Sequence, residues 1–450
     1  MMRTALDKKE KTRNVRLSFA LQGVGRKGVL VAKKGVNCDC RGGKLRKAPA
    51  GTPCLKSDRS PRVCTISNVA KICLIKEYSN ADGTYVERFS VLDQNGRFYV
   101  QRQDTQSFTL LLGGLPGADV VRTVDRNNWV KTVFINGETC LILEANYTGK
   151  AVKLANNCKT GAFFKHRLFV GVKPSALACS APGDELSFTE SVYDGGLLRF
   201  PCVGGEIVAI KPFEDKLYVF FEYGILKLTV GGAIKDFEAQ EIEYVGGKIY
   251  GRTVRATNKA LFFMAEDGLY RLDGRSVKRL FSDFVQLPKE ETLLESGVGY
   301  GDKVLIRYLT DEGYKTLAVY EDGEDCFYMD GLNALSCEEG GRCLFIDENK
   351  RICQLSEDGV FGSVGRFIGA ETDFGLSGRK TLTKLSFEGK GNVSVTIENG
   401  GRTFVRSLIF EDGKAEVKLS ERGDKFVFHF TLSSGSEISS AVAEVKRLAV

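Results

Sequence analysis

Tight-turn dipeptides recur through the chain beyond residue 60, and they strongly limit what it can fold into. Nine Asp-Gly or Asn-Gly pairs separate short runs of Val, Ile, Leu, Phe and Tyr. Such pairs supply the positive φ angles that two-residue hairpin turns need. The pattern predicts an all-β chain built of hairpins. The nine pairs are Asp82-Gly83, Asn95-Gly96, Asn136-Gly137, Asp267-Gly268, Asp273-Gly274, Asp322-Gly323, Asp358-Gly359, Asn399-Gly400 and Asp412-Gly413.

One hairpin pattern repeats at intervals close to those of propeller blades. It consists of an apolar strand, a polar turn and a second strand with an aliphatic or aromatic residue and often a basic one. Its seven copies begin at residues 89, 140, 167, 216, 260, 304 and 343. Most intervals fit the period of about 40–50 residues of four-stranded blades. We therefore predict a β-propeller of about seven blades over residues 36–370. Six blades, eight blades or a set of stacked sandwiches are the alternatives.

The last part of the chain has a different pattern. From residue 380 onward apolar and polar residues alternate more strictly, as in Asn392–Glu398 and Lys425–Thr431. Such alternation is typical of sheets with one buried and one exposed face. We predict a C-terminal antiparallel β-sandwich over residues 371–450, whose exposed faces and edges are available to neighbouring subunits.

Positive charge is concentrated at the N-terminus. Residues 1–62 contain 17 Lys or Arg and 4 Asp or Glu, whereas the net charge of the whole chain is +7. A basic segment on a mildly acidic body favours an anionic partner, and a merely solvated N-terminus is the alternative. We predict a basic N-terminal extension over residues 1–35, with contacts to DNA or to an acidic neighbouring subunit. The candidate contact residues are Lys8, Lys9, Lys11, Arg13, Arg16, Arg26, Lys27, Lys33, Lys34, Arg41, Lys44, Arg46 and Lys47.

The side chains of common catalytic and metal sites are scarce. The chain has two histidines, His166 and His429, and neither lies in a pattern that suggests a catalytic triad. Its thirteen cysteines form no Cys-x-x-Cys pair, and several, such as Cys73 and Cys140, lie inside apolar runs. We expect them to be reduced and buried, as in a protein assembled in a reducing cytoplasm. The sequence thus predicts no enzyme activity, no metal site and no cofactor.

One stretch resembles a known family. Arg167-Leu-Phe-Val170 is followed by Ser180-Ala-Pro-Gly-Asp184, then by Ile207-Val-Ala-Ile210 and by Leu217-Tyr-Val-Phe220. Together they resemble the β-propeller proteins at the neck or tail hub of tailed bacteriophages, such as the packaged-DNA stabilisation (tail accessory) proteins of short-tailed phages. Thr372-Asp-Phe-Gly375 is similar to the exit from propeller to sandwich in some phage structural proteins. The resemblance covers residues 165–228 well and the rest of the chain only in general character.

The resemblance implies a non-enzymatic virion structural protein, assembled in the host cytoplasm as a ring or as copies around the tail axis. It would be an adaptor or hub that docks portal, adaptor or tail subunits and helps to retain or guide DNA. Separately, no stretch of the sequence approaches the roughly 18 uninterrupted apolar residues of a membrane span, so we expect no contact with a membrane.

Two other functions remain open. The first is a carbohydrate- or receptor-binding propeller of the tail tip, in which tyrosines would line the ligand pocket. The second is a hydrolase or lyase, which would need carboxylates clustered at the propeller axis. The tyrosines in question are Tyr218, Tyr223, Tyr250, Tyr270, Tyr300, Tyr308, Tyr314 and Tyr320.

Overall fold

Strands account for nearly all the regular secondary structure. The computed structural model describes residues 12–20, 29–56, 59–79, 83–101, 107–125, 127, 129–144, 149–158, 160–189, 194–201, 203–282, 285–288, 297–337, 342–357, 359 and 364–447. Helical structure within these residues is limited to three single-turn 3₁₀ segments, η1 (Arg41–Gly43), η2 (Ile234–Asp236) and η3 (Gly251–Thr253).

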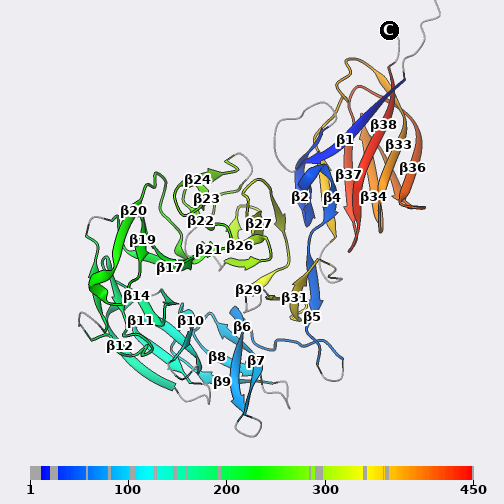
Figure 1. Ribbon diagram of the computed structural model, residues 1–450. Helices are drawn as coiled ribbons and strands as arrows, with labels where there is room; N and C mark the ends of the chain where they lie inside the picture. The colour runs from blue at the N-terminus through cyan, green and yellow to red at the C-terminus, as the bar shows by residue number, and fades with distance from the viewer. Residues whose placement is uncertain are drawn as a thin grey trace, which may run out of the picture. The chain divides into compact units, whose positions relative to one another are not determined.

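The chain divides into two compact units (Figure 1). Unit 1 comprises Met1–Thr52, Asp325–Gly331 and Leu355–Val450, and unit 2 comprises Pro53–Glu324 and Leu332–Gln354. Unit 2 is therefore inserted into the sequence of unit 1.

Seven consecutive sheets form a seven-bladed β-propeller, which confirms the predicted fold and blade number. Blade 1 consists of β6 (Val69–Ser79), β7 (Thr84–Asp93), β8 (Phe98–Gln101) and β9 (Phe108–Leu112). Blade 2 consists of β10 (Asp119–Val124), β11 (Val130–Leu143) and β12 (Gly149–Cys158). Blade 3 consists of β13 (Gly161–Phe164), β14 (Arg167–Val172), β15 (Ala176–Cys179) and β16 (Gly196–Arg199). Blade 4 consists of β17 (Ile207–Phe213), β18 (Lys216–Phe221), β19 (Ile225–Thr229) and β20 (Glu238–Ile242).

The remaining three blades have four strands each. Blade 5 consists of β21 (Arg255–Ala256), β22 (Leu261–Ala265), β23 (Gly268–Leu272) and β24 (Val277–Leu280). Blade 6 consists of β25 (Gly297–Tyr300), β26 (Lys303–Thr310), β27 (Gly313–Tyr320) and β28 (Cys326–Met329). Blade 7 consists of β29 (Asn333–Cys337), β30 (Cys343–Ile346), β31 (Ile352–Ser356) and the early strand β5 (Ala50–Pro53).

The repeated hairpin of the sequence corresponds to the same part of every blade. All seven copies coincide with the second and third strands, for example β18 and β19 in blade 4. Eight of the nine predicted turn glycines have a positive φ, Gly359 being the exception. Gly96 (φ 76°) also has no room for a side chain, because a Cβ atom there would lie 2.1 Å from the backbone nitrogen of Pro116.

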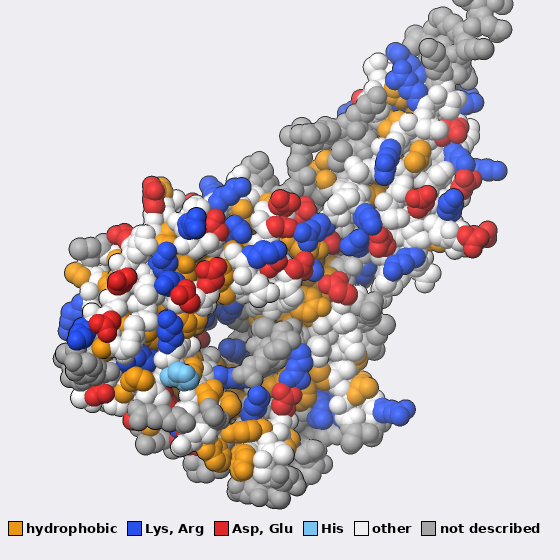
Figure 2. Space-filling view, in the orientation of Figure 1, with side chains coloured by type: hydrophobic (Ala, Val, Ile, Leu, Met, Phe, Trp, Pro, Cys, Tyr) orange, Lys and Arg blue, Asp and Glu red, His pale blue; other side chains and the backbone are white. Residues whose placement is uncertain are grey.

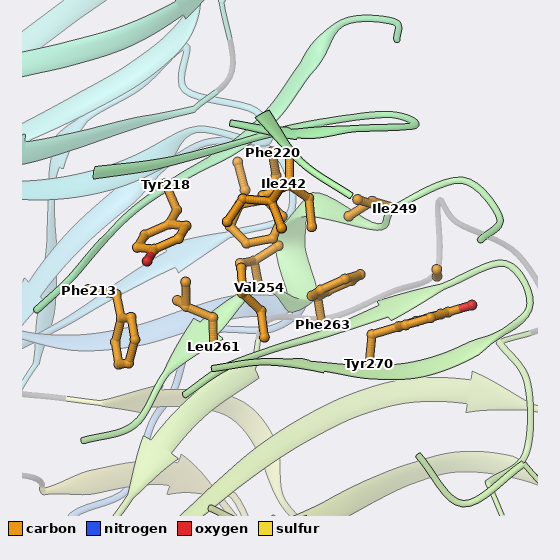
Figure 3. Packing of buried hydrophobic residues seen from close by; sticks show 13 residues of the cluster. Phe213, Tyr218, Phe220, Ile242, Ile249, Val254, Leu261, Phe263 and Tyr270 are labelled. Carbon is orange, nitrogen blue, oxygen red and sulfur yellow. The ribbon is translucent and has the colours of Figure 1, made fainter. Parts of the chain in front are cut away.

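The hydrophobic core of the propeller lies between its blades. Figure 3 shows the cluster between blades 4 and 5, where Phe220 meets Phe263 edge to face with ring centroids 5.4 Å apart. Val254 and Leu261 are fully buried in the same cluster. A strand that packs on both faces needs apolar residues at successive positions, which explains the continuous apolar run of β18.

The ring closes where the first and last parts of unit 2 meet. The backbone N–H of Cys54 donates to the carbonyl of Ile352 (2.9 Å), and the N–H of Ile352 donates to the carbonyl of Arg62 (2.9 Å). Ile72 and Leu74 of blade 1 share a buried cluster with Ile352 and other residues of blade 7. Residues nearly 300 positions apart in the chain thus complete the disc.

Unit 1 is built from strands of both chain ends. One sheet path runs β3-β4-β38-β1-β2-β32-β37-β34-β35, and β33 pairs with both β36 and β38. Buried residues alternate with partly exposed ones in β34, and Phe387 of β33 packs against Phe430 of β37 at 6.0 Å. The strands are β1 (Thr12–Ala20), β2 (Val29–Val36), β3 (Cys38–Asp39), β4 (Leu45–Lys47), β32 (Gly365–Gly369), β33 (Lys380–Lys390), β34 (Val393–Asn399), β35 (Arg402–Leu408), β36 (Lys414–Gly423), β37 (Val427–Leu432) and β38 (Glu437–Arg447).

The domain boundaries predicted at residues 35/36 and 370/371 differ from the structure. β1 pairs antiparallel with β38, from Thr12 opposite Lys446 to Leu17 opposite Ala441, and β2 pairs with β32, so the described part of the predicted extension forms two integral strands of unit 1 (Figure 1). The physical reason is the alternation of buried Val15, Leu17 and Phe19, whose apolar side chains need a core. The extreme N-terminus, residues 1–11, lies outside the described residues.

Candidate functional site

The first strands of the blades surround the propeller axis. In the structure β10 contacts β13, β13 contacts β17, β17 contacts β21, β21 contacts β25, β25 contacts β29, and β29 contacts β6. Side chains of these strands that do not enter the cores between blades are therefore brought near one another, although they are far apart in sequence.

Charged residues on the first strands are mostly basic. The described first strands carry five Lys or Arg and two Asp or Glu, all in blades 1, 2, 4 and 5. The strands β13, β25 and β29 carry none. The seven residues are Lys71, Lys76, Glu77, Asp119, Arg122, Lys211 and Arg255.

Three of these cations form a group that we name the axial cation cluster: Lys71, Lys211 and Arg255. Lys211 is half-buried, and burial followed by the positive charge of Arg255 lowers its pKa from 10.5 to about 8. The charge of Lys71 also lowers this pKa, whereas Asp119 raises it. The like charges thus lie close enough to repel one another.

The two carboxylates of the first strands are engaged by other groups. Glu77 accepts a hydrogen bond from Arg88 Nε at 2.6 Å. Asp119 Oδ2 accepts from Thr160 Oγ1 and from the backbone N–H of Gly161, each at 3.2 Å. The two donors to Asp119 Oδ2 are neutral, so Asp119 keeps its negative charge, but the described first strands still carry more cations than carboxylates.

Figure 2 shows an opening in the disc, with Lys and Arg side chains at its edge. Lys71, Lys211 and Arg255 are each half-buried. The arrangement is suited to holding an anion.

The sequence offered no local motif for this cluster. Lys71, Lys211 and Arg255 lie in three different blades, and only closure of the ring brings them together. The available signal was one or two Lys or Arg in the strand before a repeated hairpin, which is a weak indication without the fold.

The thirteen basic residues predicted to contact a partner do not form one continuous arm. Lys8, Lys9, Lys11, Arg26 and Lys27 lie outside the described residues. Four of the thirteen are exposed on strands of unit 1: Arg13 and Arg16 on β1, and Lys33 and Lys34 on β2. Their contact with a partner stays a prediction.

The other four members follow β3 and make contacts within unit 1. Lys44 and Arg46 both pair with Glu437, at 3.5 and 3.4 Å. Lys47 Nζ donates to the carbonyl of Ala48 at 3.2 Å, and burial lowers its pKa to about 8. The backbone N–H of Arg41 donates to Asp39 Oδ1 at 3.0 Å. Part of this positive charge is therefore compensated inside the fold.

Three aromatic rings form a partly exposed group on blades 1 and 2, which we name the aromatic trio. Tyr78 lies 4.8 Å from Trp129 and 5.4 Å from Tyr85, between ring centroids, and Tyr85 lies 6.5 Å from Trp129. Tyr85 and Trp129 are 37% and 38% exposed. Asp125 Oδ1 orders the turn by accepting the N–H groups of Asn127 and Trp129.

Most of the eight tyrosines considered for a ligand pocket instead belong to the blades. Tyr223 and Tyr314 are exposed, and Tyr300 is half-buried. The other five are buried, and Tyr270, for example, stacks on Phe263 at 5.3 Å. The five are Tyr218, Tyr250, Tyr270, Tyr308 and Tyr320.

The cysteines and histidines are placed as structural residues. The described thiols form no disulfide, and all but the half-buried Cys54 are buried, as expected. Burial raises the pKa of Cys140 to about 12 and that of Cys179 to about 11, which disfavours the reactive thiolate. His429 lies on β37, with Nε2 3.4 Å from Glu398. Among the described residues no three His, Cys, Asp or Glu side chains are grouped as metal ligands. A search of the same residues for a long apolar helix able to cross a membrane found none.

Fold and site together define an all-β protein with a seven-bladed propeller, whose described first strands carry more basic than acidic residues. No protein-family model and no curated protein sequence matches the chain. Similar solved structures include a streptogramin B lyase, with 11% identity over 66% of this chain and 96% of that chain (TM-score 0.44). Virginiamycin B lyase from Staphylococcus aureus has 12% identity over 64% and 99% (TM-score 0.44). The WD40 propeller domain of Doa1 has 10% identity over 70% and 97% (TM-score 0.43).

Proposed function

We propose that this chain is a non-enzymatic structural protein of a tailed phage or phage-derived particle, an adaptor or hub at the neck or tail. Its partners are other virion subunits, with DNA as a further candidate, and it assembles in the host cytoplasm as a homo-oligomeric ring. The observation that carries the proposal is the family-like stretch at residues 165–228, which forms the consecutive strands β14 to β19.

The chemistry of the described side chains supports a binding rather than a catalytic role. Thiol pKa values are raised, and the described contact of His429 is one carboxylate, Glu398, on the surface of a strand. Turnover of a substrate by the purified chain would contradict this part of the proposal.

The assembly proposal is tested by the state of the full-length protein. We expect sedimentation and negative-stain images to reveal rings, or incorporation into particles when the chain is produced with portal and tail subunits. A protein that stays monomeric and joins no particle contradicts the proposal.

The DNA contact is tested separately on the exposed arginines of β1. Replacing Arg13 and Arg16 together by Glu removes two exposed positive charges, and the matched control replaces Arg402 and Arg406 on exposed β35. If β1 faces DNA, the first variant weakens binding to a DNA duplex and reduces the slope of log K against log salt by about 2. Equal binding by the two variants rejects a role of β1 in DNA contact.

A second candidate function, carbohydrate or receptor binding, is favoured by the aromatic trio. Exposed aromatic rings provide flat apolar faces, and Tyr hydroxyl and Trp N–H groups supply polar ends. An ion pair between Arg342 and Glu87 at 2.6 Å adds polar groups from blade 1 and its neighbour, since Glu87 shares the face of Tyr85 on β7.

A glycan array tests this second function. The wild-type chain should bind a defined set of glycans, Trp129→Ala should lose them, and Tyr223→Ala, which removes a more exposed ring of blade 4 (54%), should keep them. An array without signal counts against carbohydrate binding.

A further inference from the structure

We propose that the axial cation cluster of Lys71, Lys211 and Arg255 is a binding site for a phosphate-type oxyanion in the middle of the propeller. The inference does not depend on the virion assignment, because it follows from the charges that ring closure brings together. It concerns unit 2 alone.

The first step is convergence. Lys71 comes from β6 of blade 1, Lys211 from β17 of blade 4 and Arg255 from β21 of blade 5. Three first strands that face the axis from different sides therefore each supply one cation.

The second step is the imbalance of charge. Glu77 is engaged by Arg88, and Asp119 Oδ2 by the neutral donors Thr160 and Gly161. Among the described first-strand carboxylates, Asp119 is the one whose charge acts on Lys211, against the charges of Arg255 and Lys71. Half-buried like charges raise the free energy of the folded state, and a bound anion offsets that cost.

The third step is the shape of the ligand. A tetrahedral oxyanion presents acceptor oxygens in several directions, so it suits donors that approach from separate strands. Lys supplies a compact charge and Arg a planar fork of N–H donors, and both are common phosphate ligands. The ligand class is therefore phosphate, either as a free ion or small ester or as part of a nucleic-acid backbone.

Calorimetric titration of the full chain with inorganic phosphate tests the site. We expect saturable binding, weakened at least about tenfold by Lys211→Met and by Lys71→Met, because each removes one charged contact. Lys278→Met, on the exposed part of β24, is the matched control and should leave the affinity unchanged.

A variant that is expected to strengthen phosphate binding separates an effect on the site from damage to the fold. Asp119→Asn removes the opposing negative charge while its amide oxygen still accepts from Thr160 and Gly161, so phosphate should bind several-fold more tightly. A merely disturbed propeller would not gain affinity.

A second titration identifies the source of the phosphate. Binding of inorganic phosphate without competition from a single-stranded oligonucleotide supports a free phosphate or small ester. Competition by the oligonucleotide, lost in the same two Lys variants, supports a nucleic-acid backbone. Absence of saturable binding by both probes, or equal weakening by Lys278→Met, overturns the proposal.

Discussion

Arg167 Nη2 donates a hydrogen bond to the carbonyl oxygen of Gly232 at 2.7 Å and thereby joins blade 3 to blade 4. Its Nη1 donates to the carbonyl of Ser180 at 2.9 Å and also to that of Asp194, and the guanidinium lies over the ring of Phe237. The side chain is 1% exposed. The first residue of the family-like Arg167–Val170 stretch therefore connects loops of two blades.

Replacing Arg167 should destabilise the propeller. Arg167→Met leaves three buried or part-buried carbonyl groups without this donor, so we expect a loss of roughly 3 kcal/mol in the free energy of unfolding. Urea unfolding, followed by the fluorescence of the single tryptophan, Trp129 in unit 2, measures it. Arg199→Met, on the exposed end of β16, is the control and should change stability by less than about 0.5 kcal/mol. Equal stability of both variants would mean that water replaces the guanidinium.

Lys211 should make the stability of the propeller depend on pH. Its pKa of about 8 is below the unfolded value near 10.5, so the unfolded chain binds more protons between these pH values. The cost of the charged form is fully present below pH 8 and disappears as the pH rises through 10.5. The neighbouring charges are Arg255, Lys71 and Asp119.

The matching experiment compares the wild type with Lys211→Met. After allowance for partial exposure, the variant should be more stable by about 1–2 kcal/mol at pH 7, and the difference should shrink between pH 8 and 10.5. Lys278→Met should track the wild type at every pH. A difference that does not change with pH is evidence that packing, rather than charge, dominates at this position.

Ring closure should depend on the apolar contact between blades 7 and 1. Ile352→Ala removes a fully buried side chain of the closure cluster, and we expect a loss of about 2–4 kcal/mol by the same unfolding assay. Leu287→Ala, at a residue 49% exposed, serves as the control for loss of an apolar side chain. If Ile352→Ala behaves like this control, the disc does not need the contact to stay closed.

Phe19 should be essential for unit 1, in contrast to the predicted free extension. Its ring packs edge to face on Phe367 (5.6 Å) and Phe430 (5.3 Å), so Phe19→Ala should cost about 3–5 kcal/mol. Hydrogen exchange should accelerate in β38, the partner of β1, whereas the neighbouring exposed change Arg16→Ala should leave exchange as in the wild type. Unchanged protection of β38 in Phe19→Ala is incompatible with an integral β1.

Local sequence patterns were sufficient to predict the strands, the tight turns and the number of blades. The seven hairpin copies coincide with the second and third strands because tight turns and apolar runs depend mainly on neighbouring residues. The irregular interval of 27 residues, between the copies at 140 and 167, is also explained. Blade 2 has three strands, and the pair β11 and β12 is followed directly by blade 3.

Local sequence patterns could not predict the domain boundaries or the axial cation cluster. The alternation of Val15, Leu17 and Phe19 indicated a strand, but the strong basic charge around it directed the interpretation to a separate extension. The pairing with β38 joins residues more than 400 positions apart. Likewise, the thirteen predicted contact residues are neighbours in sequence, whereas the axial cluster comes from three distant blades.

The amino-acid sequence by itself determined an all-β chain with about seven repeated hairpins, because backbone conformation at Asp-Gly turns and in apolar strands is set by adjacent residues. Only the tertiary structure decided that β1 belongs with the C-terminal strands and that Lys71, Lys211 and Arg255 share the axis. Burial and electrostatic interaction act between residues that are close in space, and that closeness exists only after the ring has closed.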